Sequence, residues 1–231
     1  MDLTSCPASP KRWERYLKSK GTTVLRCCVN RPAFSNSGKQ QRMERYFARM
    51  ELLWQTRWEN ELYHQACQAL AAWQSEAPFT PWQASMDYTV TYWKSPLLSI
   101  RIDIREQRAA MPPAVQCIGE VWDCSDGYPC SLRSFLPAKL LRWKSHLISL
   151  MQEQAAQRLE SGESLLNSNC HSAIKQSFDR SRFYLSEDGL MLFYPLYTLG
   201  SYGEGIPTFT VPVSVENQSN KLRAPSITAR R

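Results

Sequence analysis

The chain lacks any apolar run that approaches the roughly 20 residues needed to cross a bilayer. Its first residues also lack the charged-then-apolar organisation of a secretory signal. There is no Cys-x-x-Cys pair and the three histidines are isolated, so no spacing indicates a zinc site. Gly-x-Ser-x-Gly, P-loop and His-Glu-x-x-His motifs are absent too. These absences lead us to expect a cytoplasmic chain without a membrane span, metal or other cofactor.

Positive charge is concentrated at the two ends of the chain. The formal net charge of +7 comes from 28 Lys and Arg against 21 Asp and Glu. Residues 1–22 carry +3, residues 212–231 carry +3, and the part between them carries only +1. A nucleic-acid-binding fold normally carries its basic patch on the folded surface. Nucleic acid is therefore not the expected partner, although binding through the two basic ends stays an alternative.

The eight cysteines are predicted to be reduced and mostly buried. The chain is 43% hydrophobic and 11% aromatic, which is enough for a packed core that needs no disulfides. Disulfide frameworks are typical of small exported proteins. Cys124 and Cys130 flank a turn, however, and their pairing under oxidising conditions stays open.

A long helix is predicted over residues 40–77, where apolar residues recur at steps of three and four and no Gly or Pro interrupts the pattern. The stripe comprises Met43, Phe47, Met50, Trp54, Trp58 and Leu62, widened by Tyr46, Leu53 and Leu70. Residues 1–22 are polar and aperiodic, and we expect a flexible lead-in there. A short strand is predicted over Val24–Val29, and the helix that follows it is the long N-terminal helix of the fold.

Strand signals follow the helix in runs. Period-two alternation predicts a hairpin over residues 86–92 and 98–104 and a third strand over residues 115–123. Later strands are predicted at residues 183–185, 190–194 and 208–211, the last an edge strand because Pro207 and Pro212 enclose it. Between these groups, residues 137–159 and 165–178 have helical periodicity, with Ser134 a possible cap and Gly162 a stop.

The order of elements predicts an α+β fold, because its strands occur in runs instead of alternating singly with helices. We expect a mainly antiparallel sheet covered by the long N-terminal helix and by a second helix pair. The domain boundaries follow from composition. Residues 1–22 form the lead-in, residues 23–212 a single domain, and residues 213–231 a disordered basic tail.

Several stretches together carry a resemblance to a known family: Trp82, Tyr88–Tyr92, Leu98–Ile100, Gly119–Asp123, Gly127, Leu132–Pro137, Phe183–Leu190, Tyr194–Tyr202 and Gly203–Phe209. They resemble the RsiV-like domain family of unknown function, which is found in the extracytoplasmic part of an anti-sigma factor and beside polysaccharide deacetylase domains. The resemblance covers residues 22–213 and is most specific at the end.

The resemblance implies a bacterial recognition domain. In the best understood member of the family, the exported domain resembles a receptor: it binds lysozyme, and binding exposes the anti-sigma factor to proteolysis. The present sequence shows no membrane segment, sigma-binding segment or signal peptide, so the signalling role does not carry over. What carries over is the fold and a general role in recognising a protein or cell-wall-related ligand.

The candidate binding site is the loop from Tyr194 to Ile206, because it combines tyrosines with glycines. Tyrosines supply rigid amphipathic contact area, and glycines allow unusual backbone angles. The predicted partner-binding residues are Tyr194, Pro195, Tyr197, Tyr202 and Glu204. The alternative is that these aromatic side chains only cover the end of the sheet.

No catalytic residue is assigned, and we expect a protein that is not an enzyme. The alternative is a hydrolase of cell-wall material that works through paired carboxylates. Glu120 with Asp123 or Asp103 with Glu106 could supply such a pair. Asp123, next to Asp126 and Gly127, is more typical of a turn cap than of a catalytic group.

Overall fold

The computed structural model describes residues 6–162 and 164–213, and these residues form two compact units. The first unit holds the described residues as far as Thr89, together with Arg101–Ile118 and Asp126–Tyr128. The second holds Val90–Ile100, Gly119–Ser125 and the described residues from Pro129 onward. The expectation of a single domain over residues 23–212 stays a prediction. The tail expected over residues 213–231 lies outside the described residues, apart from Val213.

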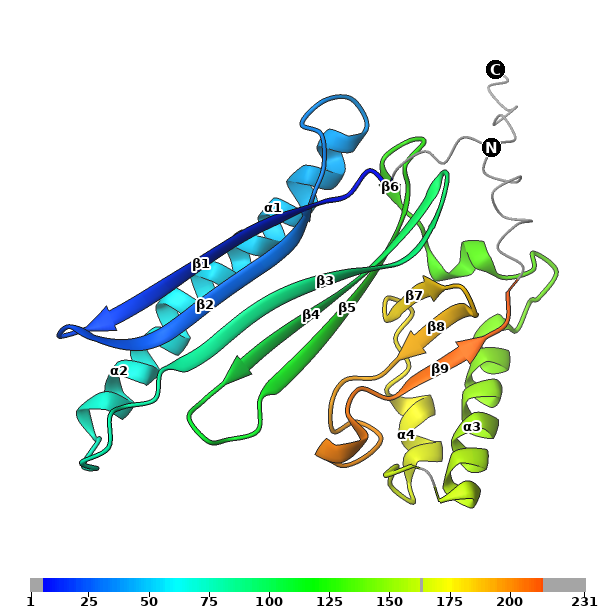
Figure 1. Cartoon of the computed structure of the whole chain (residues 1–231). Coiled ribbons are helices and arrows are strands. Elements are labelled where there is room, and N and C mark those ends of the chain that lie inside the picture. Colours follow the sequence, from blue (N-terminus) through cyan, green and yellow to red (C-terminus); the bar gives the residue numbers. More distant parts are fainter. Residues whose placement is uncertain (1–5, 163, 214–231) are drawn as a thin grey trace. The chain divides into compact units, whose positions relative to one another are not determined.

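Figure 1 shows the elements, and the sheets confirm an α+β fold that is mostly antiparallel. A six-stranded sheet has the order β1-β2-β3-β4-β5-β6, in which β2 and β3 are parallel, and a three-stranded antiparallel sheet has the order β7-β8-β9. The strands of the larger sheet are β1 Ser9–Ser19, β2 Thr22–Ala33, β3 Trp82–Lys94, β4 Leu97–Gln107, β5 Ala114–Asp123 and β6 Tyr128–Pro129. Those of the smaller sheet are β7 Phe183–Ser186, β8 Gly189–Phe193 and β9 Thr208–Val211.

The helical elements complete the chain. They are α1 Gln40–Arg57, the π-helical turn η1 Trp58–Leu62, α2 Tyr63–Ala71, the short 3₁₀ turn η2 Leu132–Phe135, α3 Trp143–Ser161, α4 Cys170–Gln176 and the 3₁₀ turn η3 Tyr202–Glu204. None of the helices within the described residues is long and apolar enough to span a membrane.

The flexible lead-in expected over residues 1–22 is wrong for Ser9–Ser19, which form β1 and pair antiparallel with β2. The two strands are joined by Lys20 and Gly21, both with positive φ (48° and 85°), as a tight two-residue hairpin turn requires. Hydrophobic periodicity did not predict β1, because it is an edge strand with mostly exposed side chains. Only Trp13, Leu17 and Ser19 are partly buried along it.

The long helix is present, but it lies after β1 and β2 and is therefore not N-terminal. It packs along β2 within the first unit (Figure 1). Much of the predicted stripe faces inward: Met43, Phe47, Trp58 and Leu62 are buried. Leu53, which was expected to widen the stripe, is 62% exposed.

The predicted hairpins and strands of both sheets are confirmed by β3, β4, β5, β7, β8 and β9. Along β4 the alternation behaves as expected, because Ile100, Ile102 and Ile104 are all buried. Strand β9 lies at an edge of its sheet, as the flanking prolines predicted.

In the second unit, α3 begins at Trp143 instead of Pro137. Its N-cap is Arg142, so Ser134 does not cap it and lies in η2 instead. Gly162 ends the helix with φ 71°, as predicted. The helix packs beside β9 and α4 (Figure 1), and this packing places its first residues next to the segment that follows α4.

Candidate functional site

The loop predicted to bind a partner begins with a residue that belongs to the core. Tyr194 is 2% exposed, its hydroxyl donates a hydrogen bond to the Ile174 carbonyl oxygen at 2.9 Å, and its ring packs edge-on against Phe209. Burial raises the pKa of Tyr194. This position corrects the assignment of Tyr194 to the partner-binding residues, because its side chain is closed to a partner.

Tyr197 and Tyr202 are the exposed tyrosines of the loop. Tyr197 is 61% exposed and Tyr202 37%, and their ring centroids lie 6.0 Å apart. Tyr197 has φ 66°, in the left-handed region that glycine usually occupies. A turn closed by the hydrogen bond from the Thr198 N–H to the Pro195 carbonyl oxygen (3.1 Å) holds this conformation. Pro195 is exposed within that turn.

Glu204 anchors the loop. Its carboxylate accepts hydrogen bonds from the Ser164 hydroxyl (2.9 Å) and from the Leu165 backbone N–H (2.6 Å). Next to it, a Cβ on Gly200 would come within 2.7 Å of the Leu165 carbonyl oxygen, so only glycine fits this approach. Both hydrogen bonds stabilise the loop itself, so a structural role for Glu204 is the alternative to its predicted role in binding.

Leu165 extends the exposed surface beside the tyrosines. It is 58% exposed, and its side chain lies against Gly203, where a Cβ would meet it at 2.7 Å. We call Leu165, Tyr197 and Tyr202 the tyrosine patch. Sequence analysis missed Leu165 because it lies outside the loop and reaches it only through the fold.

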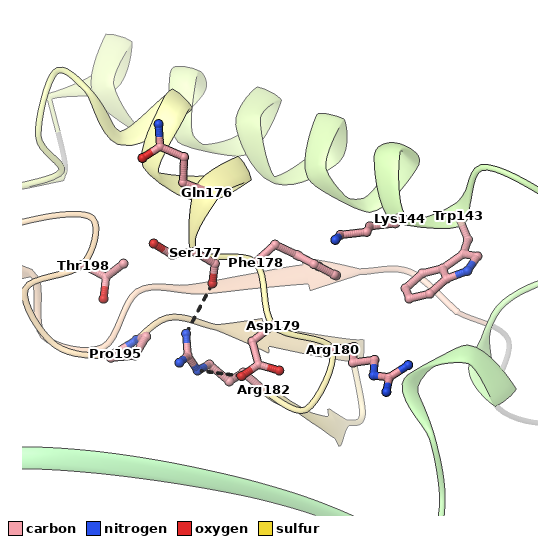
Figure 2. Close-up of a pocket in the computed structure, with 10 residues that line it drawn as sticks. All are labelled: Trp143, Lys144, Gln176, Ser177, Phe178, Asp179, Arg180, Arg182, Pro195 and Thr198. Carbon is pink, nitrogen blue, oxygen red and sulfur yellow. Dashed lines mark hydrogen bonds and ion pairs between the residues drawn. The ribbon is translucent and has the colours of Figure 1, made fainter.

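A basic pocket of about 720 Å³ opens in the second unit (Figure 2). The first residues of α3, the end of α4, the segment between α4 and β7, and the tyrosine-bearing loop all contribute to it. Its lining consists of Trp143, Lys144, Gln176, Ser177, Phe178, Asp179, Arg180, Arg182, Pro195 and Thr198. Pro195 is the single predicted site residue that lines it.

The segment between α4 and β7 is a tight turn that presents two arginines to this pocket. The Arg182 N–H donates to the Asp179 carbonyl oxygen (3.2 Å), which places Arg180 second in the turn. One carboxylate oxygen of Asp179 accepts the backbone N–H (2.9 Å) and the hydroxyl (2.7 Å) of Ser181. The other lies 3.6 Å from Arg182 Nε. The Ser181 hydrogen bonds lower the pKa of Asp179, and the charges of Arg182 and Arg180 lower it further.

The basic pocket was not predicted from the sequence, although the sequence contains a cluster of charged residues that indicates it. Two arginines two residues apart follow an aspartate directly before the confirmed hairpin. Their proximity to Lys144, more than 30 residues earlier, comes only from the packing of α3 against α4.

The proposed carboxylate pairs are not brought together. Residues 120 and 123 of β5 are separated by an odd number of positions, so their side chains point to opposite faces of the strand. Asp123 is 5% exposed and accepts the Ser125 N–H at 2.7 Å, as a turn cap does. Asp103 and Glu106 also differ in parity on β4.

Arginines hold both carboxylates of the second pair. Asp103 accepts from Arg101 at 2.9 Å, and Glu106 accepts from Arg57 at 2.9 Å. No group of three or more His, Cys, Asp or Glu side chains within residues 6–162 and 164–213 could hold a metal ion. Within the described residues, no disulfide joins the cysteines.

The fold is similar to that of two solved structures. One is the crystal structure of a DUF3298 family member from Bacteroides fragilis, with 15% sequence identity, a TM-score of 0.61, and coverage of 89% of this chain and 88% of that one. The other is a DUF3298 family protein from Pseudomonas aeruginosa, with 16% identity, a TM-score of 0.59, and coverage of 93% and 92%. At such identities the similarity establishes the fold.

Residues 139–214 match the family model described as protein of unknown function, DUF3298. No curated protein matches the chain. The matched segment contains α3, α4 and the whole three-stranded sheet, and it includes the tyrosine patch and every residue that lines the basic pocket. Both candidate surfaces thus lie within the residues that match this family model.

Proposed function

We propose that the chain is a non-enzymatic recognition domain of the RsiV-like type, which binds a protein or a cell-wall-related ligand through the tyrosine patch. The observation that carries the proposal is the pair formed by Tyr197 and Tyr202, whose rings pack against each other and yet stay exposed. Tyrosines that sit in this way give a partner a large amphipathic contact at small entropic cost.

The backbone beneath the patch supports the proposal. Glu204 ties the loop to Ser164 and Leu165, and an isolated bridge pairs Leu166 with Gly200. These bonds hold the loop in one conformation before a partner arrives. A preorganised surface loses less conformational entropy on binding than a mobile one. The left-handed backbone of Tyr197 is consistent with such a role, because strained residues cluster at binding sites.

The hydrolase alternative finds no support in the geometry. Glu120 and Asp123 project from opposite faces of β5, and Asp123 is occupied by its turn. A glycosidase-type reaction needs both carboxylates on one substrate. Incubation of the chain with peptidoglycan fragments is the direct test, since turnover that disappears in Glu120→Gln would restore the enzymatic reading.

The recognition proposal is tested with a double variant, Tyr197→Ala with Tyr202→Ala, in the full chain. Ligands retained by the wild type from cell extract and from cell-wall fragments are identified, and the affinity for each is measured by titration calorimetry. Loss of a tyrosine at the centre of an interface costs at least ~2 kcal/mol, so we expect affinity to fall by a factor of roughly 30.

The matched control is Tyr16→Ala in β1, where a tyrosine of similar exposure (54%) lies in the first unit. This control should bind as the wild type does. A second control, Tyr194→Phe, removes a buried hydroxyl without touching the patch. If the double variant keeps the affinity of the wild type for every ligand, the tyrosine patch is not the binding surface.

A further inference from the structure

The basic pocket carries an excess of positive charge that the protein itself does not neutralise. Lys144, Arg180 and Arg182 line it together with a single carboxylate, that of Asp179. That carboxylate is already engaged by Ser181 and Arg182. Within the described residues the side chains of Arg180 and Lys144 have no ion-pair partner. The lining therefore carries a net charge of +2, which an anion in the pocket would balance.

The side chain of Arg182 is held in place before any ligand binds. Arg182 donates to the Ser177 carbonyl oxygen (3.3 Å) and lies beside Asp179, while its own carbonyl oxygen accepts the Phe193 N–H (3.2 Å) from β8. Figure 2 shows both contacts of the Arg182 side chain and the neighbouring Arg180 at the pocket. Because the turn fixes the backbone of both arginines, little ordering is needed when they contact an anion.

An aromatic wall adjoins the cations. The rings of Trp143 and Phe178 meet edge to face with centroids 6.4 Å apart. The ammonium group of Lys144 lies 5.5 Å from the centroid of the Phe178 ring. The wall offers an apolar surface to a ring or hydrocarbon portion of a ligand, while the cations contact its charged group.

The start of α3 adds a second, independent feature that suits an anion. Trp143 and Lys144 are the first residues of this 19-residue helix, and both line the pocket. Its N-cap, Arg142, makes no side-chain hydrogen bond to the helix, and the first turn has no acidic residue. Unsatisfied N–H groups and the positive end of the helix dipole favour an anion near this end.

We propose that the basic pocket binds a phosphate monoester whose ring or hydrocarbon portion packs on Trp143 and Phe178. The pocket volume of about 720 Å³ lies within the range of small-molecule sites, about 300–1,000 Å³. A phosphate monoester carries a charge of about −2 near neutral pH, which matches the lining, and guanidinium groups bind its oxygens in a fork. A carboxylate ligand would carry half that charge. This inference does not rest on the tyrosine patch.

A neighbouring hollow of about 470 Å³ shares Trp143 and Arg180 with the basic pocket. Its other charged residues are Glu120 and Arg133, and Arg133 donates to the carbonyl oxygens of Pro137 and Ala138. Their charges cancel, so the phosphate group belongs in the basic pocket. The neighbouring hollow offers space for the rest of a longer ligand.

The experiment titrates the full chain with phenyl phosphate, benzoate and phenol by calorimetry at pH 8 and low salt. These three probes share one ring and differ in charge. We expect phenyl phosphate to bind about tenfold more tightly than benzoate, and phenol to show no binding. Binding of phenyl phosphate should weaken as salt is raised, because part of the pocket is open to solvent. Equal affinity for benzoate and phenyl phosphate would refute the assignment to phosphate.

Two variants locate the site. Arg180→Gln and Lys144→Gln each remove a cation that has no ion-pair partner among the described residues, so both should fold as the wild type does. Each should weaken phenyl phosphate binding about tenfold. Thermal unfolding of both variants checks the fold, and the transition should not shift by more than a few degrees.

The matched control is Lys175→Gln, which removes the same charge from an exposed residue of α4 outside the lining. It should change the affinity less than twofold. If the control weakens binding as much as Arg180→Gln does, the interaction is diffuse attraction and the pocket is not the site. The double variant of Tyr197 and Tyr202 should bind phenyl phosphate normally, which separates this inference from the proposed recognition of a partner.

Discussion

The most specific prediction about stability concerns Arg31, because it is a charged residue with only 1% of its surface exposed. It lies on β2, and its guanidinium group donates to carboxylates of two glutamates on α1. Nη2 bonds Glu44 Oε1 at 2.7 Å, Nε bonds Glu51 Oε2 at 2.5 Å, and Nη1 bonds the Pro32 carbonyl oxygen at 2.8 Å. Through these bonds Arg31 joins the hairpin to the helix in the first unit.

The perturbation is Arg31→Met, which keeps most of the aliphatic side chain and removes the charge. Glu44 and Glu51 then keep only the more distant charge of Lys11, 3.8 Å from Glu51, and their side-chain exposures are only 20% and 11%. Breaking a buried ion pair from one side costs about 3–5 kcal/mol. A loss of this size is a large part of the total stability of an ordinary domain, about 5–15 kcal/mol.

The pH dependence gives the prediction a second, independent signature. Burial raises the pKa of Glu44 and Glu51, but the hydrogen bonds from Arg31 outweigh it, and both pKa values are lowered in the folded protein. Their contribution to stability is therefore present above the unfolded-state pKa of about 4.3 and is lost as the pH falls through the lower folded-state values.

Without Arg31, burial becomes the stronger influence and moves the pKa of both carboxyl groups upward. The protonated forms then favour the folded state, so stability is lost as the pH rises through the raised folded-state values. The difference in unfolding free energy between wild type and variant should thus be largest near pH 7 and shrink toward pH 4. Trp13 Nε1 still donates to Glu51, and the Phe34 N–H to Glu44, which reduces the upward shift.

The assay is hydrogen exchange of peptides from α1 and β2, measured from pH 4 to pH 8 at several urea concentrations, because it reports on the first unit alone. Arg26→Met on the same strand is the control. Its ion pair with Glu14 is 46% and 38% exposed, so its removal should cost far less stability than Arg31→Met does. The reasoning is refuted if Arg31→Met costs no more than this control near pH 7, or if its cost does not shrink toward pH 4.

Two further predictions concern buried groups. Ser99→Ala removes the hydroxyl oxygen that accepts the buried Leu185 N–H at 2.8 Å and that also bonds Thr91. The free energy of unfolding of the second unit, measured in urea, should therefore fall by about 1–3 kcal/mol. An unchanged midpoint would show that water replaces the hydroxyl. Burial raises the pKa of the Cys27 and Cys117 thiols to about 12. At pH 8 both should react with iodoacetamide far more slowly in the folded chain than in urea, and rapid native-state labelling seen by peptide mass spectrometry would contradict the predicted burial.

The hydrophobic pattern of neighbouring residues was sufficient to predict most helices and strands, but not β1. The hairpin of β7 and β8 follows from apolar runs on either side of Asp188-Gly189, and β4 follows from its alternating isoleucines. Strand β1 has no such alternation. It lies at the edge of the sheet with most of its side chains in solvent, and its position depends on hydrogen bonds to β2.

The candidate site was only partly predictable for the same physical reason. Tyr194 and Tyr197 stand three residues apart in one loop, and the sequence offers no ground to separate them. Packing against Phe209 and a hydrogen bond to Ile174 bury the first, while the second extends from a turn into solvent. Burial is decided by residues that come from elsewhere in the chain.

By itself, the sequence determined where most strands and helices form, because hydrophobic periodicity is a property of neighbouring residues. It also determined the stop at Gly162, since the backbone freedom of glycine is local. Only the tertiary structure decided that Arg31 is buried between two glutamates and that Lys144 meets Arg180 and Arg182 in one pocket. Charges act through space, so their partners follow from the fold rather than from their spacing in the sequence.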